Sequence, residues 1–212
     1  MSLEAGTVCL PAEAPGAVDR AVDALRQGEV IAFPTDTVYG AGAHAFLPQA
    51  VARLYAVKGR PAGMAIPLLL PGVEAMAGVC VEIPGLAWEI AERFWPGALS
   101  LVLKRAPGVP DAVTAGGATV AVRVPDHALV RELCRRVGAP LAASSANRHG
   151  QPPPVTAGEV WAALGGSIPL ILDGGPCPGG VASTVLDLTV SPPVIRRPGP
   201  VTAEELAPFI AL

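Results

Sequence analysis

The sequence predicts an α/β fold in which short buried strands alternate with amphipathic helices. Three observations support this class. Apolar residues make up 51% of the 212 residues and charged residues 16%, which supplies a sizeable core and excludes global disorder. Short apolar runs closed by Pro or Gly recur along the chain, as in buried strands. Between them lie segments with apolar residues at helical spacing. At this length, a single domain over residues 1–212 is expected.

The chain is organised around residues 30–61. Val30–Phe33 is a short apolar run closed by Pro34, which predicts a buried strand. Thr35, Asp36 and Thr37 then place small polar groups on a turn at the strand's end. An α/β fold lines a ligand crevice with such groups.

A helix is predicted to begin at Pro48 and to end near Lys58. Lys58 and Arg60 are two residues apart, so in an extended segment both side chains would project to the same side and suit a polyphosphate. An alternative remains open, in which Lys58 only compensates the helix dipole and Gly59 caps the helix.

The remaining elements follow from the same patterns. Apolar residues at helical spacing predict helices over 15–28, 85–94, 126–137, 156–164 and the closing 202–212, with Asp126 as an N-cap. Apolar or alternating runs predict strands over 65–70, 98–105, 119–125, 169–175, 181–189 and 193–199, and a strand from 140 that runs into Ser144. The Pro/Gly-rich residues 106–118 are predicted to form a loop.

Arg123 stands among valines in a predicted strand. A cation there is costly unless it is paired or reaches a mouth of the fold. Strict alternation with the valines would instead place it on a solvent-facing edge. The pattern alone favours neither interpretation.

Composition and motifs exclude several function classes. The formal charge is −3 and there is no block of Lys and Arg, which argues against extended nucleic-acid binding as the main role. The four cysteines lie far apart without metal-binding spacing, which argues against structural zinc. No targeting segment or membrane-spanning run is recognisable, so a cytoplasmic soluble protein is expected. No P-loop, dinucleotide fingerprint, nucleophile elbow or HExxH motif is present.

A recurring scheme remains: cations and small polar residues stand at predicted strand ends along the whole chain. Their charges suit a triphosphate together with a small carboxylate, and no nucleophile–base pair stands out. Catalysis by positioning and charge neutralisation is therefore expected. The residues are Thr35, Lys58, Arg60, Thr119, Arg123, Ser145, Asn147, Ser183 and Arg197.

Seven segments, in order, resemble the threonylcarbamoyl-AMP synthase family with its YrdC-like fold. They are PTDTVYG, LYAVKGRP, FWPGALSLVL, TVAVRVPDH, SSAN, GGVASTVLDL and IRRPG, and they cover roughly residues 15–200. The resemblance implies a twisted mixed sheet flanked by helices, with a concave, positively lined cleft. Because a further domain of longer members is not recognised, the chain resembles the short single-domain bacterial form.

The resemblance implies an enzyme that makes threonylcarbamoyl-AMP and pyrophosphate from L-threonine, bicarbonate or CO2, and ATP with Mg²⁺. No organic cofactor is implied and no protein-held metal, since Mg²⁺ would be bound mainly through the ATP phosphates. A separate transferase complex would use the product to modify tRNA. By similarity, ATP would be bound by Lys58, Arg60, Thr119, Ser145, Asn147 and Arg197, with Lys58 and Arg60 catalytic, and threonine by Thr35, Arg123 and Ser183.

Two positions depart from the family pattern. Many members have a Lys or His between KGRP and the next strand, where this chain has Ala62, Gly63, Met64 and Ala65. Ala182 stands where an acidic residue is common. Both departures affect the expected substrate contacts, not the fold.

Two other functions are alternatives to the threonylcarbamoyl-AMP synthase activity. An RNA-binding or ribosome-assembly module would use the same basic cleft, but the near-neutral charge and the scarcity of aromatic residues weaken it. A carbamoyl-adenylating domain like that of hydrogenase-maturation proteins is the other, but those domains belong to longer chains with zinc-finger-like cysteines.

Overall fold

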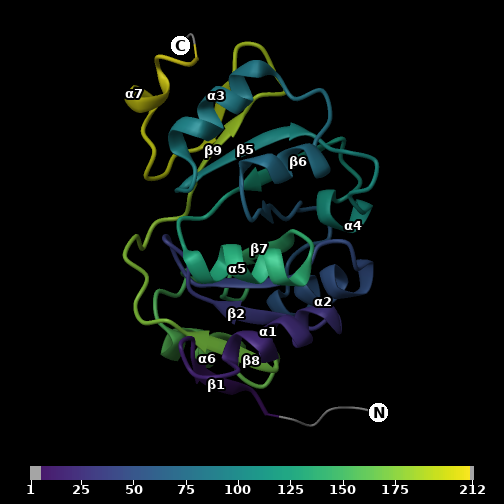
Figure 1. Ribbon diagram of the computed structural model, residues 1–212, viewed down its shortest axis with the longest axis vertical. Helices are drawn as coiled ribbons and strands as arrows, with labels where there is room; N and C mark the ends of the chain where they lie inside the picture. Colours follow the sequence, from purple (N-terminus) through teal and green to yellow (C-terminus); the bar gives the residue numbers. More distant parts are fainter. Residues whose placement is uncertain (1–5, 211–212) are drawn as a thin grey trace.

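The computed structural model describes residues 6–210, and within them the predicted α/β class is confirmed. Strands form one mixed sheet in the order β1-β8-β2-β3-β7-β4-β6-β5-β9-β10, flanked by helices (Figure 1). The strands are β1 (Val8–Pro11), β2 (Ile31–Phe33), β3 (Gly40–His44), β4 (Leu68–Leu69), β5 (Leu99–Lys104), β6 (Thr119–Arg123), β7 (Leu141–Ser145), β8 (Leu170–Asp173), β9 (Thr184–Asp187) and β10 (Val194–Arg197). The helices are α1 (Ala17–Arg26), α2 (Pro48–Lys58), α3 (Gly85–Phe94), α4 (Asp111–Thr114), α5 (Ala128–Val137), α6 (Ala157–Leu164), α7 (Ala203–Leu206) and the 3-10 helix η1 (Val73–Gly78).

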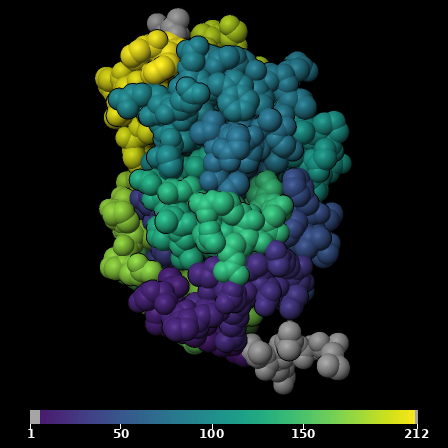
Figure 2. All heavy atoms as spheres, viewed as in Figure 1, coloured from purple at the N-terminus to yellow at the C-terminus, as the bar shows by residue number. Residues whose placement is uncertain are grey.

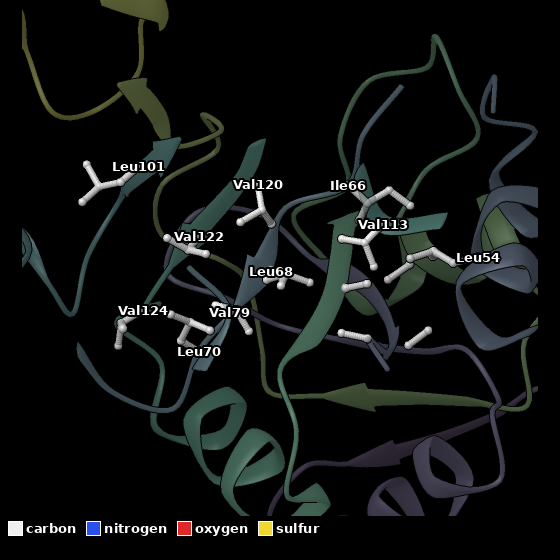
Figure 3. Packing of buried hydrophobic residues seen from close by; sticks show 14 of the residues in the cluster. Leu54, Ile66, Leu68, Leu70, Val79, Leu101, Val113, Val120, Val122 and Val124 are labelled. Atoms are coloured by element: carbon white, nitrogen blue, oxygen red, sulfur yellow. The ribbon is translucent and has the colours of Figure 1, made fainter. Parts of the chain in front are cut away.

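Helices cover both faces of the sheet. α1 and α5 contact each other and bury their apolar sides in one core with Phe33 and Leu141. Figure 2 shows the outer surfaces of these two helices, α1 in purple and α5 in green, side by side on one face of the molecule. The larger core packs helices α2, α3 and α6 against the sheet. In Figure 3, Leu68 and Val122 from adjacent strands lie together in this larger core.

Strand β3 was not predicted, because its sequence, GAGAH, has neither alternation nor bulky apolar residues. The structure supplies the reason. β3 pairs with β2 and β7, and the ring of Phe33 lies directly over it. A Cβ on Gly42 would come within 2.8 Å of that ring, and one on Gly40 within 3.0 Å. Small residues are therefore required here by a neighbour in space, which periodicity cannot show.

Other predictions need correction at element boundaries. Asp126 is not the N-cap of α5: that position is His127, and its side chain forms no capping hydrogen bond. Only Leu68–Leu69 of the predicted strand 65–70 pairs as a strand, because prolines flank this short run. The predicted loop 106–118 contains the short helix α4. Edge strand β1 was missed, and the closing helix is confined to α7, residues 211–212 lying outside the described range.

Within residues 6–210, no helix combines the length and the apolar character needed to cross a membrane.

Candidate active site

A cleft of about 160 Å³ lies where the turn after β2 faces the ends of several strands. It is lined by three arginines, by hydroxyl residues and by small apolar residues. The lining residues are Thr35, Thr37, Val38, Gly40, Arg60, Pro67, Leu69, Ser100, Arg123, Ala143, Ser144, Ser145, Ala182, Ser183 and Arg197. Six of the nine predicted site residues are in this set: Thr35, Arg60, Arg123, Ser145, Ser183 and Arg197.

Arg123 is a buried cation with a fixed orientation. Its side chain is not on a solvent-facing edge, because β6 lies inside the sheet between β4 and β5 and the residue is only 6% exposed. Nη2 donates to the Asp36 carboxylate at 2.6 Å and Nε to the Gly97 carbonyl at 2.8 Å. Burial lowers the pKa of Arg123, and the charge of Asp36 opposes that shift. The guanidinium is thus held charged and pre-oriented at the cleft.

A chain of hydroxyls continues from Arg123 into the turn. Arg123 Nη1 donates to Thr37 Oγ1 at 3.2 Å, and Thr37 Oγ1 lies 2.9 Å from Thr35 Oγ1. The Thr35 hydroxyl donates its one proton to the Val38 carbonyl at 2.7 Å, so Thr37 must be the donor between the two threonines. Thr35 Oγ1 also accepts from the backbone N–H groups of Thr37 and Val38. The Thr35 hydroxyl is therefore occupied in shaping the turn.

Arg197 and Ser183 form a second fixed pair in the cleft lining. Arg197 donates to the Ser183 carbonyl through Nε (3.0 Å) and Nη2 (2.7 Å), and to its Oγ at 3.2 Å. Ser183 Oγ also lies 2.9 Å from the buried hydroxyl of Ser100. Burial and the nearby charge of Arg123 lower the pKa of Arg197. Both guanidinium groups line the same cleft, an arrangement suited to anions.

Lys58 is almost fully buried, with 2% of its surface exposed. Its ammonium donates to the carbonyls of Ser145 and, at 2.6 Å, of Asn147. In return, the backbone N–H of His149 donates to the Lys58 carbonyl at 2.7 Å. Burial lowers the pKa of Lys58 to about 8, and the charge of Arg60 contributes to the shift. Lys58 thus joins the end of α2 to the segment that follows β7, with one N–H remaining.

The segment after α2 is not extended, so the predicted geometry of Lys58 and Arg60 is wrong. Gly59 adopts the left-handed conformation, φ 59°, and caps the helix, which turns the chain. Lys58 points to the end of β7, whereas Arg60 folds over its own loop. Arg60 Nε donates to the Met64 carbonyl at 3.0 Å and Nη2 to the Ala65 carbonyl at 2.8 Å. The two cations are still close enough for Arg60 to depress the Lys58 pKa.

Two predicted residues, together with Lys58, lie outside the cleft lining. Thr119 begins β6 opposite Lys104. Asn147 is 6% exposed and borders a shallower groove beside α6, and its amide Nδ2 donates to the Arg148 and Gln151 carbonyls. Asn147 Oδ1 is buried without a hydrogen-bond partner in the described chain. The roles of all nine predicted residues toward ATP and threonine remain predictions.

Four polar residues at the site were not among the predicted ones: Asp36, Thr37, Ser100 and Ser144. Asp36 and Thr37 stood in the turn that the sequence singled out, and a carboxylate beside two hydroxyls was an available signal for Asp36. Ser100 carried no signal, because a serine inside an apolar strand pattern is unremarkable. It lines the cleft and contacts Ser183, which is 83 residues away in sequence.

Several cations outside the cleft are paired with carboxylates. On α5, the basic stripe forms ion pairs: Arg131 with Asp126, Arg135 with Glu132, and Arg136 with Asp19. This agrees with a solvated helix face. In contrast, neither Arg60 nor Arg197 forms an ion pair within residues 6–210.

The described chain contains no cluster of three His, Cys, Asp or Glu residues that could hold a metal. The cleft therefore offers positive charge and hydroxyl groups, with Asp36 as the one carboxylate bound to its arginines.

The chain resembles known proteins along most of its length. The Sua5/YciO/YrdC family model, described as "Telomere recombination", matches residues 23–199. The threonylcarbamoyl-AMP synthase of Pyrococcus abyssi is 44% identical over 186 residues, which are 88% of this chain and 55% of that protein. A putative threonylcarbamoyl-AMP synthase of Mycobacterium tuberculosis is 42% identical over 192 residues, 91% of this chain and 88% of the relative.

A solved structure agrees with these relatives. The crystal structure of P. abyssi Sua5 complexed with L-threonine superimposes with a TM-score of 0.90 at 43% identity, covering 92% of this chain and 57% of that one. The chain spans about half the length of the P. abyssi protein and most of the M. tuberculosis protein. With a family model matched over most of its residues and relatives above 40% identity, the chain belongs to the Sua5/YciO/YrdC family.

Proposed function

We propose that this protein is a threonylcarbamoyl-AMP synthase, an ATP-dependent nucleotidyltransferase that uses L-threonine and bicarbonate or CO2. The main support is the charge of the cleft: three guanidinium groups line it, and one carboxylate, Asp36, compensates one of them. That excess suits a triphosphate and an amino-acid carboxylate together. The name of the P. abyssi relative and its complex with L-threonine point to the same substrates.

In this proposal Arg123 binds the threonine carboxylate. Its guanidinium has five N–H groups, and three are donated to Asp36, Thr37 and Gly97. The two that remain can form a bidentate pair with a carboxylate. Thr35 and Ser183 frame the amino-acid end, with Thr35 acting through the turn that it stabilises.

ATP is proposed to lie along the arginines on the other side of the cleft. Arg60 and Arg197 would take phosphate oxygens, and the remaining N–H of Lys58 would take another. Ser145, Asn147 and Thr119 would position the nucleotide. Mg²⁺ would enter with ATP as part of the substrate, since Mg²⁺ in such sites is held mainly by phosphates and water, and the donors in the cleft are hydroxyls and cations.

The reaction then requires positioning more than protein acid–base chemistry. The neutral amino group of threonine attacks the carbon of CO2, a C–O π pair moves onto oxygen as the N–C bond forms, and the nitrogen releases a proton to solvent to give the carbamate. A carbamate oxygen attacks the α-phosphorus of ATP, the bond from that phosphorus to the bridging oxygen breaks, and pyrophosphate leaves with the electron pair. Cations fixed around the phosphates would stabilise the charge that develops. In a cytoplasmic pathway, a separate tRNA-modifying transferase would consume the product, and direct RNA binding would be secondary.

Pyrophosphate release tests this proposal. The protein is incubated with MgATP and bicarbonate, with each amino acid in turn and with none. We expect release that requires both threonine and bicarbonate. Release with another amino acid would preserve the chemistry and change the substrate, and it would implicate the departures at Met64 and Ala182. A folded protein that releases no pyrophosphate under any of these conditions contradicts the proposal.

A further inference from the structure

The loop that carries Arg60, residues 59–65, forms a hydrogen bond with the side chain of a residue outside the loop. Within residues 6–210, the only side-chain hydrogen bond that reaches residues 59–65 from elsewhere comes from Tyr55 on α2, whose hydroxyl donates to the Met64 carbonyl at 2.8 Å. The same carbonyl accepts Arg60 Nε at 3.0 Å. Two donors therefore converge on one oxygen, and the Tyr55 hydroxyl fixes the acceptor that orients Arg60.

This arrangement matters because Arg60 is only half-buried and its side chain has many rotamers. An arginine that is free in solution loses considerable side-chain entropy when it binds an anion. Hydrogen bonds to Met64 and Ala65 remove much of that freedom beforehand. They use two of the five guanidinium N–H groups, so three remain for a ligand. A guanidinium group held in this way loses less side-chain entropy on binding an anion than a guanidinium group on a freely rotating side chain.

The environment of the Tyr55 hydroxyl agrees with this contact. Burial raises the pKa of Tyr55, while the neighbouring charge of Arg60 lowers it, so the hydroxyl lies beside the guanidinium and remains a neutral donor near neutral pH. Backbone hydrogen bonds from the Gly59 N–H to the Ala56 carbonyl (3.1 Å) and from the Arg60 N–H to the Tyr55 carbonyl (3.0 Å) fix the beginning of the loop to α2, and the Met64 N–H donates to the Pro61 carbonyl at 3.1 Å in the turn that follows. The Met64–Pro61 bond closes the turn, and the Tyr55 hydroxyl is the group on α2 that bonds the far end of the loop, at Met64.

We propose that Tyr55 is a positioning residue for Arg60, acting through the Met64 carbonyl. Its hydroxyl orients the guanidinium toward the cleft so that Arg60 can receive the phosphates of the nucleotide. This inference rests on the proposed function, because it takes Arg60 as a ligand of ATP.

The test is a double-mutant cycle of Tyr55→Phe and Arg60→Ala, with KM for ATP, KM for threonine and kcat measured by pyrophosphate release. Tyr55→Phe retains the ring and removes only the hydroxyl. We expect KM for ATP to rise about five-fold, the typical effect of one lost hydrogen bond, with little change in KM for threonine. In the Arg60→Ala background the same substitution should have almost no effect on KM for ATP, because its target is gone.

Tyr39→Phe is the matched control, since the chain has two tyrosines. The Tyr39 hydroxyl donates to the Gly175 carbonyl at 2.8 Å, and its loss should lower stability without raising KM for ATP. An unchanged KM for ATP in Tyr55→Phe, or an equal rise in both backgrounds, would overturn the inference while leaving the synthase intact. A wild-type protein that neither binds ATP nor releases pyrophosphate would overturn both proposals.

Discussion

The buried charge of Lys58 gives a quantitative prediction about stability. Burial lowers its pKa from the ordinary 10.5 to about 8 in the folded protein. Between these values the unfolded chain binds more protons than the folded one, so the free energy of unfolding contributed by Lys58 rises with pH. At about 1.4 kcal/mol per pH unit, the charged form destabilises the fold by about 3 kcal/mol below pH 8. About 2 kcal/mol of this is recovered between pH 7 and pH 9.5.

Replacing Lys58 with Met isolates this contribution. Methionine retains a straight side chain, has no charge and leaves the Ser145 and Asn147 carbonyls without their donor, a loss that does not depend on pH. Urea unfolding of both proteins at pH 7 and about pH 9.5 should show the wild type gaining about 2 kcal/mol relative to Lys58→Met. Tyr39 and Cys134, whose pKa values burial raises, titrate in both proteins and cancel in the difference. If the free energies of unfolding of the two proteins change equally with pH, the lowered pKa of the buried Lys58 is refuted.

Three further predictions concern the cleft. Lys58→Ala should abolish ATP-dependent pyrophosphate release while circular dichroism shows a folded chain, and full activity would contradict its role. Arg123→Lys loses the planar fork, so KM for threonine should rise about 10- to 100-fold with KM for ATP nearly unchanged; equal changes in both constants would argue against a carboxylate contact. A Cβ on Gly179 would lie 2.9 Å from the Asp36 carbonyl oxygen, so Gly179→Ala should displace the turn and lower kcat/KM for threonine several-fold, whereas Gly158→Ala, with open space around it, should not. Equal kinetics for the two glycine variants would show that the turn tolerates displacement.

Periodicity predicted most helices and the longer strands because burial repeats along a chain with the period of the element. It missed β3 because the glycines there are required by the ring of Phe33, which lies on the adjacent strand β2. The interpretation of Arg123 stayed open for a similar reason. Its partner, Asp36, is 87 residues away in sequence, and only the folded sheet brings the two together.

Resemblance to a family identified residues that periodicity could not, although it did not show how they are held. Lys58 illustrates the difference. The sequence predicted Lys58 as a phosphate ligand in an extended segment; the segment is not extended, and two N–H groups of the buried ammonium are bound to carbonyls, while the role toward phosphate stays a prediction. The left-handed Gly59 ends the helix between the two cations, and a glycine at that place in the sequence was the available signal.

As the proposed synthase, this chain joins threonine, an inorganic carbon atom and AMP into one product. The most direct measurement supplies carbon-13 bicarbonate with threonine and MgATP and analyses the nucleotide products by mass spectrometry. We expect an adenylate that contains threonine and carries the label in its carbamoyl carbon, formed together with pyrophosphate. An adenylate without the labelled carbon, or AMP and pyrophosphate with no threonine-containing product, would contradict the account.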